Sequence, residues 1–422
     1  MILIQKLDRP AAKLAVLLPV VLLGGFMLSV IRAHFVVRQL SDVRFTFEPG
    51  VFAAALSTWP QSAWLNLGMA KALIREKGDF AAALPYAELA VKLMPHNDAA
   101  WQVLGQAQDG NGEAAAAEKS LQRAVELAPR NSDANWALAN LLLRLNRVEE
   151  SVQPFGRAGE MNASLYPLAF DLLWQVGGKR LDLLRAIAGT KFEAQTALLQ
   201  FFAEQNLFDE AASLFKTLDR RKAKLDPQCA QFINTLIGRK QFALARSAWL
   251  DLAGGADRSD GNLLWNGGFE LPPVLPPLNQ FDWFLGESKF ARFGFEAERG
   301  RAGSVALKVI FQGRDTTSLN GETFQLVAVT PGVQYRLECF AKAENLVTPE
   351  GPRLAIRNAG AVLATSAPVE PGSQDWQHLQ LVFTVPLENA GINITLVRIP
   401  KYAYDEPTSG VIWFDDFVLR AQ

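Results

Sequence analysis

The sequence predicts a chain that is first α-helical and then β: an amino-terminal transmembrane helix, an α-solenoid of helical repeats and an antiparallel β-sandwich. Three observations lead to this order: an uncharged apolar run over 14–31, a 34-residue period in the region that follows, and alternation with period two after residue 262. The predicted parts are a tail (1–13), a membrane anchor (14–31), a connector (32–59), the repeats (60–253), a linker (254–261) and the sandwich (262–422).

The 34-residue period is carried by small residues and by residues that end helices. The recurring sets are Gly78, Ala83, Ala90 and Pro95, then Gly112, Ala117, Ala124 and Pro129, then the weaker set Asn146, Ser151, Ala158 and Ala163. Gly and Asn tolerate the left-handed backbone that ends a first helix, and Pro ends a second one. The period therefore predicts stacked pairs of amphipathic helices.

At this point the chain resembles the tetratricopeptide repeat family, most clearly over 98–131 and also over 64–97 and 132–165. The residues that carry the likeness are Trp101, Leu104, Gly105, Gly112, Ala117, Leu121, Ala124 and Pro129. Trp64, Leu67 and Gly68 match the start of the motif but lie three residues farther from their turn, which predicts a first helix about one turn longer. Apolar helical stripes continue to about residue 253, where the last pair is expected to cap the stack.

The resemblance implies a groove for a protein partner, because the first helix of each pair lines the concave face in this family. The residues that it places there are Gln102, Gln106, Asp109, Asp133, Trp136, Asn140 and Arg144. A tryptophan among polar side chains is typical of a partner-binding anchor. Packing of Trp136 against the next repeat is the alternative.

The apolar run Leu14–Ile31 follows Lys6, Arg9 and Lys13 and has 18 residues, about enough to cross a bilayer of roughly 30 Å. A cleavable signal peptide is the alternative, but no small-x-small site closes the run before Ile31. A buried soluble helix is disfavoured, because the run offers no polar face. We therefore expect an uncleaved, single-pass signal-anchor in a bacterial inner membrane, with the bulk of the chain in the periplasm.

Period-two alternation marks the carboxy-terminal part. Apolar residues alternate over 305–311, 379–385 and 392–397, and further strands are expected near 322–329, 335–343, 353–357 and 411–419. Turn signals such as Pro331-Gly332 and Pro371-Gly372 separate the strands. Many short strands without intervening helices predict an antiparallel sandwich.

Four segments of this part resemble the galactose-binding-like jelly roll, in particular the carbohydrate-binding modules attached to glycoside hydrolases. They are Asn-Leu-Leu-Trp-Asn-Gly-Gly-Phe-Glu at 262–270, and the segments 329–335, 376–386 and 413–417. The resemblance implies a carbohydrate ligand that stacks on aromatic side chains. The candidates for such a platform are Trp283 with Phe284, and Tyr402 with Tyr404. A core position is the alternative for Trp283.

The same resemblance places the opening segment beside the final strand, where related modules commonly hold a structural calcium ion. Glu270, Asp415 and Asp416 would supply the hard oxygen ligands that Ca²⁺ prefers. Because adjacent strand residues point to opposite faces, both aspartates reach one ion only at a bulge. The alternative is that these carboxylates cap turns or pair with arginines.

Composition narrows the class of function. The chain has 42 basic and 43 acidic residues and a net charge of −1, so it lacks the excess of positive charge that is typical of nucleic-acid-binding proteins. No nucleophile motif or phosphate loop is present, and Cys229 and Cys339 fall in different predicted domains, so a disulfide is not expected. We predict a non-catalytic scaffold that binds protein and carbohydrate in bacterial polysaccharide assembly or export. The alternatives are a protein–protein adaptor whose sandwich binds no sugar, and a glycan-active hydrolase.

Overall fold

The computed structural model describes most of the chain. The described residues are 21, 23–25, 27, 48–254, 261–313, 315–358, 360–401 and 406–422. The predicted tail, most of the predicted anchor 14–31, and all of the predicted linker except its end residues, Gly254 and Gly261, lie outside them. Among the described residues, no helix combines the length and apolar character needed to cross a membrane.

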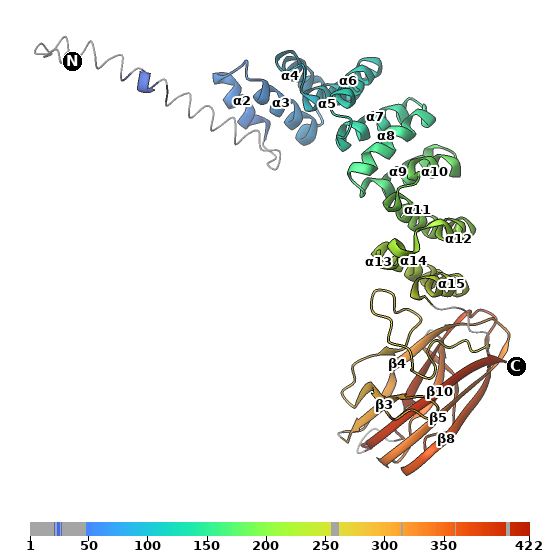
Figure 1. Cartoon of the computed structure of the whole chain (residues 1–422). Helices are drawn as coiled ribbons and strands as arrows, with labels where there is room; N and C mark the ends of the chain where they lie inside the picture. The colour runs from blue at the N-terminus through green and yellow to red at the C-terminus, as the bar shows by residue number, and fades with distance from the viewer. Residues whose placement is uncertain are drawn as a thin grey trace, which may run out of the picture. The chain divides into compact units, whose positions relative to one another are not determined.

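Two compact units make up the chain, Met1–Ala194 and Gln195–Gln422 (Figure 1). The boundary falls inside helix α11 (Phe192–Glu204), so the second unit holds both the last helices and the β-sandwich. A helical repeat region followed by an antiparallel sandwich is the order that the sequence predicts.

In the first unit, helices follow one another as antiparallel pairs. They are α2 (Pro49–Thr58), α3 (Ala63–Ala72) with a π-helical turn η1 (Leu73–Lys77), α4 (Phe80–Leu93), α5 (Asp98–Gly110), α6 (Ala114–Leu127), α7 (Ser132–Arg144), α8 (Val148–Met161), α9 (Leu165–Val176) and α10 (Leu181–Ala188). The small residues Ala83, Ala117 and Ser151 are fully buried where the helices of a pair touch. Their size lets the two backbones approach closely, as the periodicity predicts.

One hydrogen bond recurs in each of the three repeats. The side chains of Asn66, Trp101 and Asn135 each donate to a proline carbonyl six residues earlier, at 2.9, 2.9 and 3.0 Å. Asn66 and Asn135 also donate to the carbonyl of the helix-capping residue, at 2.8 Å in both cases. The bond ties the start of each first helix to the loop before it and thereby marks equivalent positions.

This equivalence corrects the predicted register of the first repeat. Asn66, and not Trp64, occupies the position of Trp101, and Trp64 is 48% exposed. From the capping residue Ser62 to Gly78 there are 16 positions, against 15 from Asn97 to Gly112. The first helix is therefore one residue longer, not one turn, and the π-helical turn absorbs the extra residue.

Helices of the second unit continue to Ala253, as the sequence predicts. After α11 come α12 (Phe208–Thr217), α13 (Arg220–Leu225), α14 (Pro227–Gly238) and α15 (Phe242–Ala253). Phe215 and Phe232 stack at 5.6 Å in their core. Burial raises the pKa of the Cys229 thiol to about 12, so this cysteine stays protonated and inert.

Two five-stranded sheets form the sandwich within the described residues, with antiparallel pairing throughout. The strands are β1 (Phe284–Leu285), β2 (Ala291–Ala297), β3 (Val305–Gln312), β4 (Leu319–Ala328), β5 (Gln334–Val347), β6 (Arg353–Asn358), β7 (Ala361–Thr365), β8 (Gly372–Thr384), β9 (Gly391–Arg398) and β10 (Ser409–Ala421). The sheet orders are β1-β4-β9-β6-β7 and β2-β3-β10-β5-β8. Strands β1, β2 and β7 have no counterpart in the sequence analysis.

The opening segment of the sandwich lies beside β10, where the resemblance placed it. The Asn262 amide donates to the Phe417 carbonyl at 3.0 Å and accepts from the Leu419 backbone N–H at 3.0 Å. Both cysteines are unpaired thiols, and Cys339 is buried in the sandwich core. The segment therefore fastens the beginning of the sandwich to its last strand.

The last helix packs one face against the sandwich loops. Trp249 of α15 is 1% exposed and contacts Trp265 edge-on at 5.0 Å between ring centroids. Its indole Nε1 donates to the Leu278 carbonyl at 2.6 Å. The last helix thus also contacts the start of the sandwich.

Candidate functional site

A cavity of about 560 Å³ in the first unit gathers all seven side chains that the sequence placed in the groove. They come from the first helices of two successive repeats, α5 and α7. Gln102 and Gln106 lie four residues apart, as do Asn140 and Arg144, so each pair shares one helix face. All seven are half-buried or exposed, and hence their polar ends are open to a partner.

Trp136 lines the cavity and also packs on the second helix of its own repeat, not on the next repeat. Its ring packs edge-to-face on Phe155 of α8, with 5.0 Å between the ring centroids. Phe155 is fully buried, whereas Trp136 is only half-buried and lines the cavity. This contact with the second helix of the same repeat holds an aromatic face at the wall of the groove.

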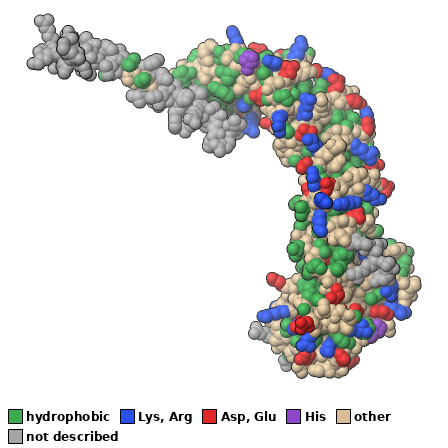
Figure 2. Space-filling view, in the orientation of Figure 1, with side chains coloured by type: hydrophobic (Ala, Val, Ile, Leu, Met, Phe, Trp, Pro, Cys, Tyr) green, Lys and Arg blue, Asp and Glu red, His purple; other side chains and the backbone are tan. Residues whose placement is uncertain are grey.

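Charges of both signs surround the cavity. Arg144 forms an ion pair with Asp109 of the neighbouring repeat. Desolvation lowers the pKa of the Lys71 ammonium, although the residue as a whole is exposed, and the nearby carboxylates Asp133 and Asp98 oppose that change. On the face drawn in Figure 2, basic and acidic side chains are interspersed over the helical region. The groove is therefore polar and mixed in charge, without one dominant sign.

The lining residues from the first repeat, Lys71, Ile74 and Arg75, escaped the sequence analysis. Lys71 lies near the end of α3, and Ile74 and Arg75 lie on the π-helical turn that follows. Because the first repeat was read in the wrong register, its groove positions were not assigned. The repeated side-chain bond of Asn66 is the feature that identifies them.

The fold places Trp283 and Phe284, which were predicted to form one aromatic platform, in different environments. Trp283 is 8% exposed and packs on Phe417 at 4.9 Å, which is the core position that the sequence left as the alternative. Phe284, the next residue, is 44% exposed and packs on Phe324 of β4 at 5.1 Å. Tyr402 and Tyr404 lie outside the described residues. The exposed Phe284 therefore forms an aromatic pair with the half-buried Phe324, which the sequence did not predict.

The carboxylates considered for calcium lie close together. β10 has a bulge against β5 after Asp415, and Asp416 takes a left-handed backbone with φ of 52°. As a result, both aspartates have a carboxylate oxygen within 4 Å of where a Cβ on Gly268 would lie. The bulge that a shared ion requires is thus present.

Other groups of the protein already form hydrogen bonds and an ion pair with these carboxylates. Asp415 accepts from the Arg301 backbone N–H at 2.7 Å, and Asp416 pairs with the Arg301 guanidinium at 2.8 Å. Glu270 accepts from the backbone N–H groups of Ser304 and Val305 at 2.7 and 2.9 Å, and the Val305 bond is the main cause of its lowered pKa. Burial raises the pKa of Asp415. Turn capping and arginine pairing are the alternative that the sequence analysis named.

Calcium binding remains a prediction of the resemblance, and a melting experiment tests it. No set of three or more His, Cys, Asp or Glu side chains in the described part of the chain is arranged to hold a metal ion. Because the carboxylates are satisfied without an ion, we expect the melting temperature to be the same in calcium and in EGTA. A rise with calcium that Glu270→Gln abolishes would instead establish the ion.

Comparison with known proteins supports the helical assignment in one segment. The tetratricopeptide repeat family matches residues 98–131. A crystal structure of MamA is 18% identical, covers 36% of this chain and 86% of that chain, and gives a TM-score of 0.30. MamA from Desulfovibrio magneticus RS-1, residue 41 to the end, is 24% identical over 28% of this chain and 65% of that chain, with a TM-score of 0.26.

A CBM4 structure is similar to another part of the chain. It is 20% identical, covers 38% of this chain and 99% of that chain, and has a TM-score of 0.29. No curated protein matches the sequence. Residues 98–131 are therefore a tetratricopeptide repeat, in a helical region that precedes an antiparallel β-sandwich.

Proposed function

We propose that this protein is a non-catalytic scaffold whose helical repeats bind a protein partner and whose sandwich binds carbohydrate. The observation that carries the proposal is the convergence of seven polar and aromatic side chains around one cavity of the first unit. Repeat arrays of this kind use such a surface for docking. In the cavity, Asp109 lies against Arg144 and Asp133 lies near Lys71, an arrangement suited to recognition of a polar segment.

Substitution of Trp136 tests the protein-binding half. The partner is first trapped in cells by a photo-crosslinking amino acid at Gln106, identified by mass spectrometry and purified. Trp136→Ala is then expected to weaken its binding about 30-fold or more, because a half-buried tryptophan at the wall of a groove is a typical hot spot. Calorimetric titration of the full chain measures the change.

Two further variants make this result specific. Arg144→Glu leaves the Trp136–Phe155 contact in place but reverses one charge at the groove, and we expect it to weaken binding as well. Gln122→Ala, on the exposed face of α6, is the matched control and should bind as the natural chain does. Equal affinity of all three variants would remove the groove from the proposal.

The carbohydrate half is supported by the sandwich fold, by the likeness of its opening and closing segments to carbohydrate-binding modules, and by the partly exposed Phe284–Phe324 pair. Binding of the full chain to a panel of immobilised glycans tests it. Failure to bind any glycan, with or without calcium, would leave a protein–protein adaptor.

We also propose that residues 14–31 anchor the chain in a bacterial inner membrane, with the bulk of it in the periplasm, where it serves polysaccharide assembly or export. The support is the uncharged apolar run and its basic flank. A periplasm-dependent reporter enzyme fused to the carboxy terminus should be active in membranes. An active reporter in the soluble fraction would contradict the anchor.

A further inference from the structure

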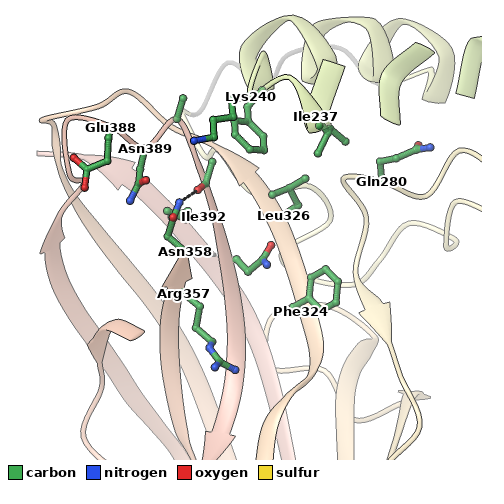
Figure 3. Close-up of a pocket in the computed structure, with 15 residues that line it drawn as sticks. Ile237, Lys240, Gln280, Phe324, Leu326, Arg357, Asn358, Glu388, Asn389 and Ile392 are labelled. Atoms are coloured by element: carbon green, nitrogen blue, oxygen red, sulfur yellow. Dashed lines mark hydrogen bonds between the residues drawn. The ribbon is translucent and has the colours of Figure 1, made fainter. Parts of the chain in front are cut away.

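A second hollow, of about 440 Å³, lies within the second unit between the α14–α15 turn and the sheet that contains β4, β9 and β6 (Figure 3). Ile237 lines it from α14, Lys240 from the turn between α14 and α15, and Gln280 from the loop before β1. Its volume falls in the range of about 300–1,000 Å³ that small-molecule sites occupy. The hollow thus has the size of a ligand site, and residues of the helical region and of the β-sheet both line it.

Strand register builds the floor of this hollow. Leu326 of β4 pairs with Asn393 of β9, which in turn pairs with Arg357 of β6. Residues opposite one another on neighbouring strands share a face of the sheet, so these three side chains form a row. Phe324 lies on the same face two residues before Leu326, and its ring carries the contact with Phe284.

Three buried polar atoms around the hollow lack hydrogen-bond partners. Among the described residues, seven buried side-chain polar atoms are unpaired, and three of those belong to residues that line this hollow: Arg357 Nε, Asn393 Oδ1 and Gln280 Oε1. A buried polar group without a hydrogen-bond partner destabilises the fold. A ligand that pairs these atoms would offset that destabilisation.

Neighbouring bonds fix the orientation of two of the three groups. Gln280 Nε2 donates to the Pro277 carbonyl at 2.7 Å, which leaves its Oε1 as the unpaired acceptor. The terminal nitrogens of Arg357 donate to the carbonyls of Asn320 and Gly360, which leaves Nε as the unpaired donor. The wall therefore offers one donor and at least one acceptor at defined places.

This combination matches the chemistry of a sugar. A hydroxyl both donates and accepts, so it pairs with either kind of atom. The C–H face of a sugar ring packs on an apolar floor such as Phe324 and Leu326. A bare carboxylate or phosphate supplies acceptors alone and would leave the oxygens of Asn393 and Gln280 unpaired.

Resting on the proposed carbohydrate function, we propose that this hollow is the sugar site. The ring of one sugar unit lies over Phe324 and Leu326, and its hydroxyls pair with Arg357, Asn393 and Gln280. The last helical hairpin forms one wall of the site, so the sandwich alone does not complete it.

Contacts within the second unit hold that wall in place. Gln280 Nε2 also donates to Asn234 of α14 at 3.1 Å. Phe242, the first residue of α15, packs on Gly391 of β9, where a Cβ would come within 2.6 Å of the ring. The helices and the sheet therefore meet without room for a side chain between them at this point.

The test uses the full chain and the tightest-binding soluble oligosaccharide from the glycan panel, which includes neutral, N-acetylated and uronic acid sugars. Gln280→Leu and Asn393→Leu are each expected to weaken binding about tenfold, the loss of one hydrogen bond to the ligand. Gln380→Leu makes the same chemical change at an exposed position of β8, in the opposite sheet, and should bind as the natural chain does.

Hydrogen exchange provides a second measurement that does not depend on a variant. Sugar binding should protect backbone amides of 237–242 on the helices together with those of 324–326 on β4. Natural affinity in both variants, without protection at 237–242, would overturn this site while the carbohydrate function stands. Absence of binding to every glycan in the panel would overturn both.

Discussion

Replacement of Arg398 by methionine is expected to lower the free energy of unfolding of the second unit by about 3–5 kcal/mol. The side chain of Arg398 is 0% exposed and that of Glu406 is 2% exposed, and they pair at 3.0 Å. Arg398 also donates to the Thr317 carbonyl at 2.8 Å and to the Glu350 carbonyl at 3.3 Å. Methionine would remove the guanidinium that pairs with the buried Glu406 carboxylate, which accounts for the size of the loss.

Calorimetric melting of the full chain measures this loss. For a unit of this size the transition should fall by about 6–20 °C. The double variant Arg398→Met/Glu406→Gln removes both charges and should regain part of the stability. Lys342→Met breaks the exposed pair with Asp375 and serves as the control, for which we expect no measurable shift. A single variant as stable as the natural chain would refute the role of the buried pair.

Trp249→Ala should have a comparable effect, a loss of about 3–5 kcal/mol in the same unit. The indole of Trp249 is nearly fully buried and touches Trp265 and Phe281, at 5.0 and 5.8 Å between ring centroids. Truncation creates a cavity among these rings and leaves the Leu278 carbonyl without its donor.

Denaturant unfolding of the natural chain and of three variants checks this expectation. Trp249→Phe keeps an aromatic ring but loses the bond to Leu278, so its midpoint should fall between those of the natural chain and Trp249→Ala. Trp64→Ala removes a tryptophan that is 48% exposed in the first unit and should change little. Equal effects of Trp64→Ala and Trp249→Ala would mean that the α15 contact adds no stability.

The groove could be predicted from sequence because its residues depend on local spacing alone. Gln102, Gln106, Asn140 and Arg144 share a face once α5 and α7 are helices, and the 34-residue period aligns the two helices. The same reasoning failed in the first repeat, where one additional residue enters a π-helical turn that no simple period reveals.

The hollow in the second unit could not be predicted, because it depends on pairing between distant strands. Leu326, Asn393 and Arg357 become neighbours only through the β4–β9–β6 register. In the sequence, Phe324 alternates with the polar residues Thr323 and Gln325, and this pattern gives no sign that Phe324 faces outward. Trp283 is an aromatic residue of the kind that forms sugar-binding platforms, yet its ring packs on Phe417 in the core. Side-chain type alone therefore does not distinguish an aromatic residue that faces outward from one that lies in the core.

The close fit of Phe242 on Gly391, together with the burial of Trp249, has a mechanical consequence. Because α15 and β9 are in direct contact there, the connection between helix and sheet differs from a flexible hinge. If the sandwich binds a polymer, as we propose, tension on that polymer would be transmitted to the neighbouring helices. The contact between α15 and β9 would then transmit force from the sheet to the helices.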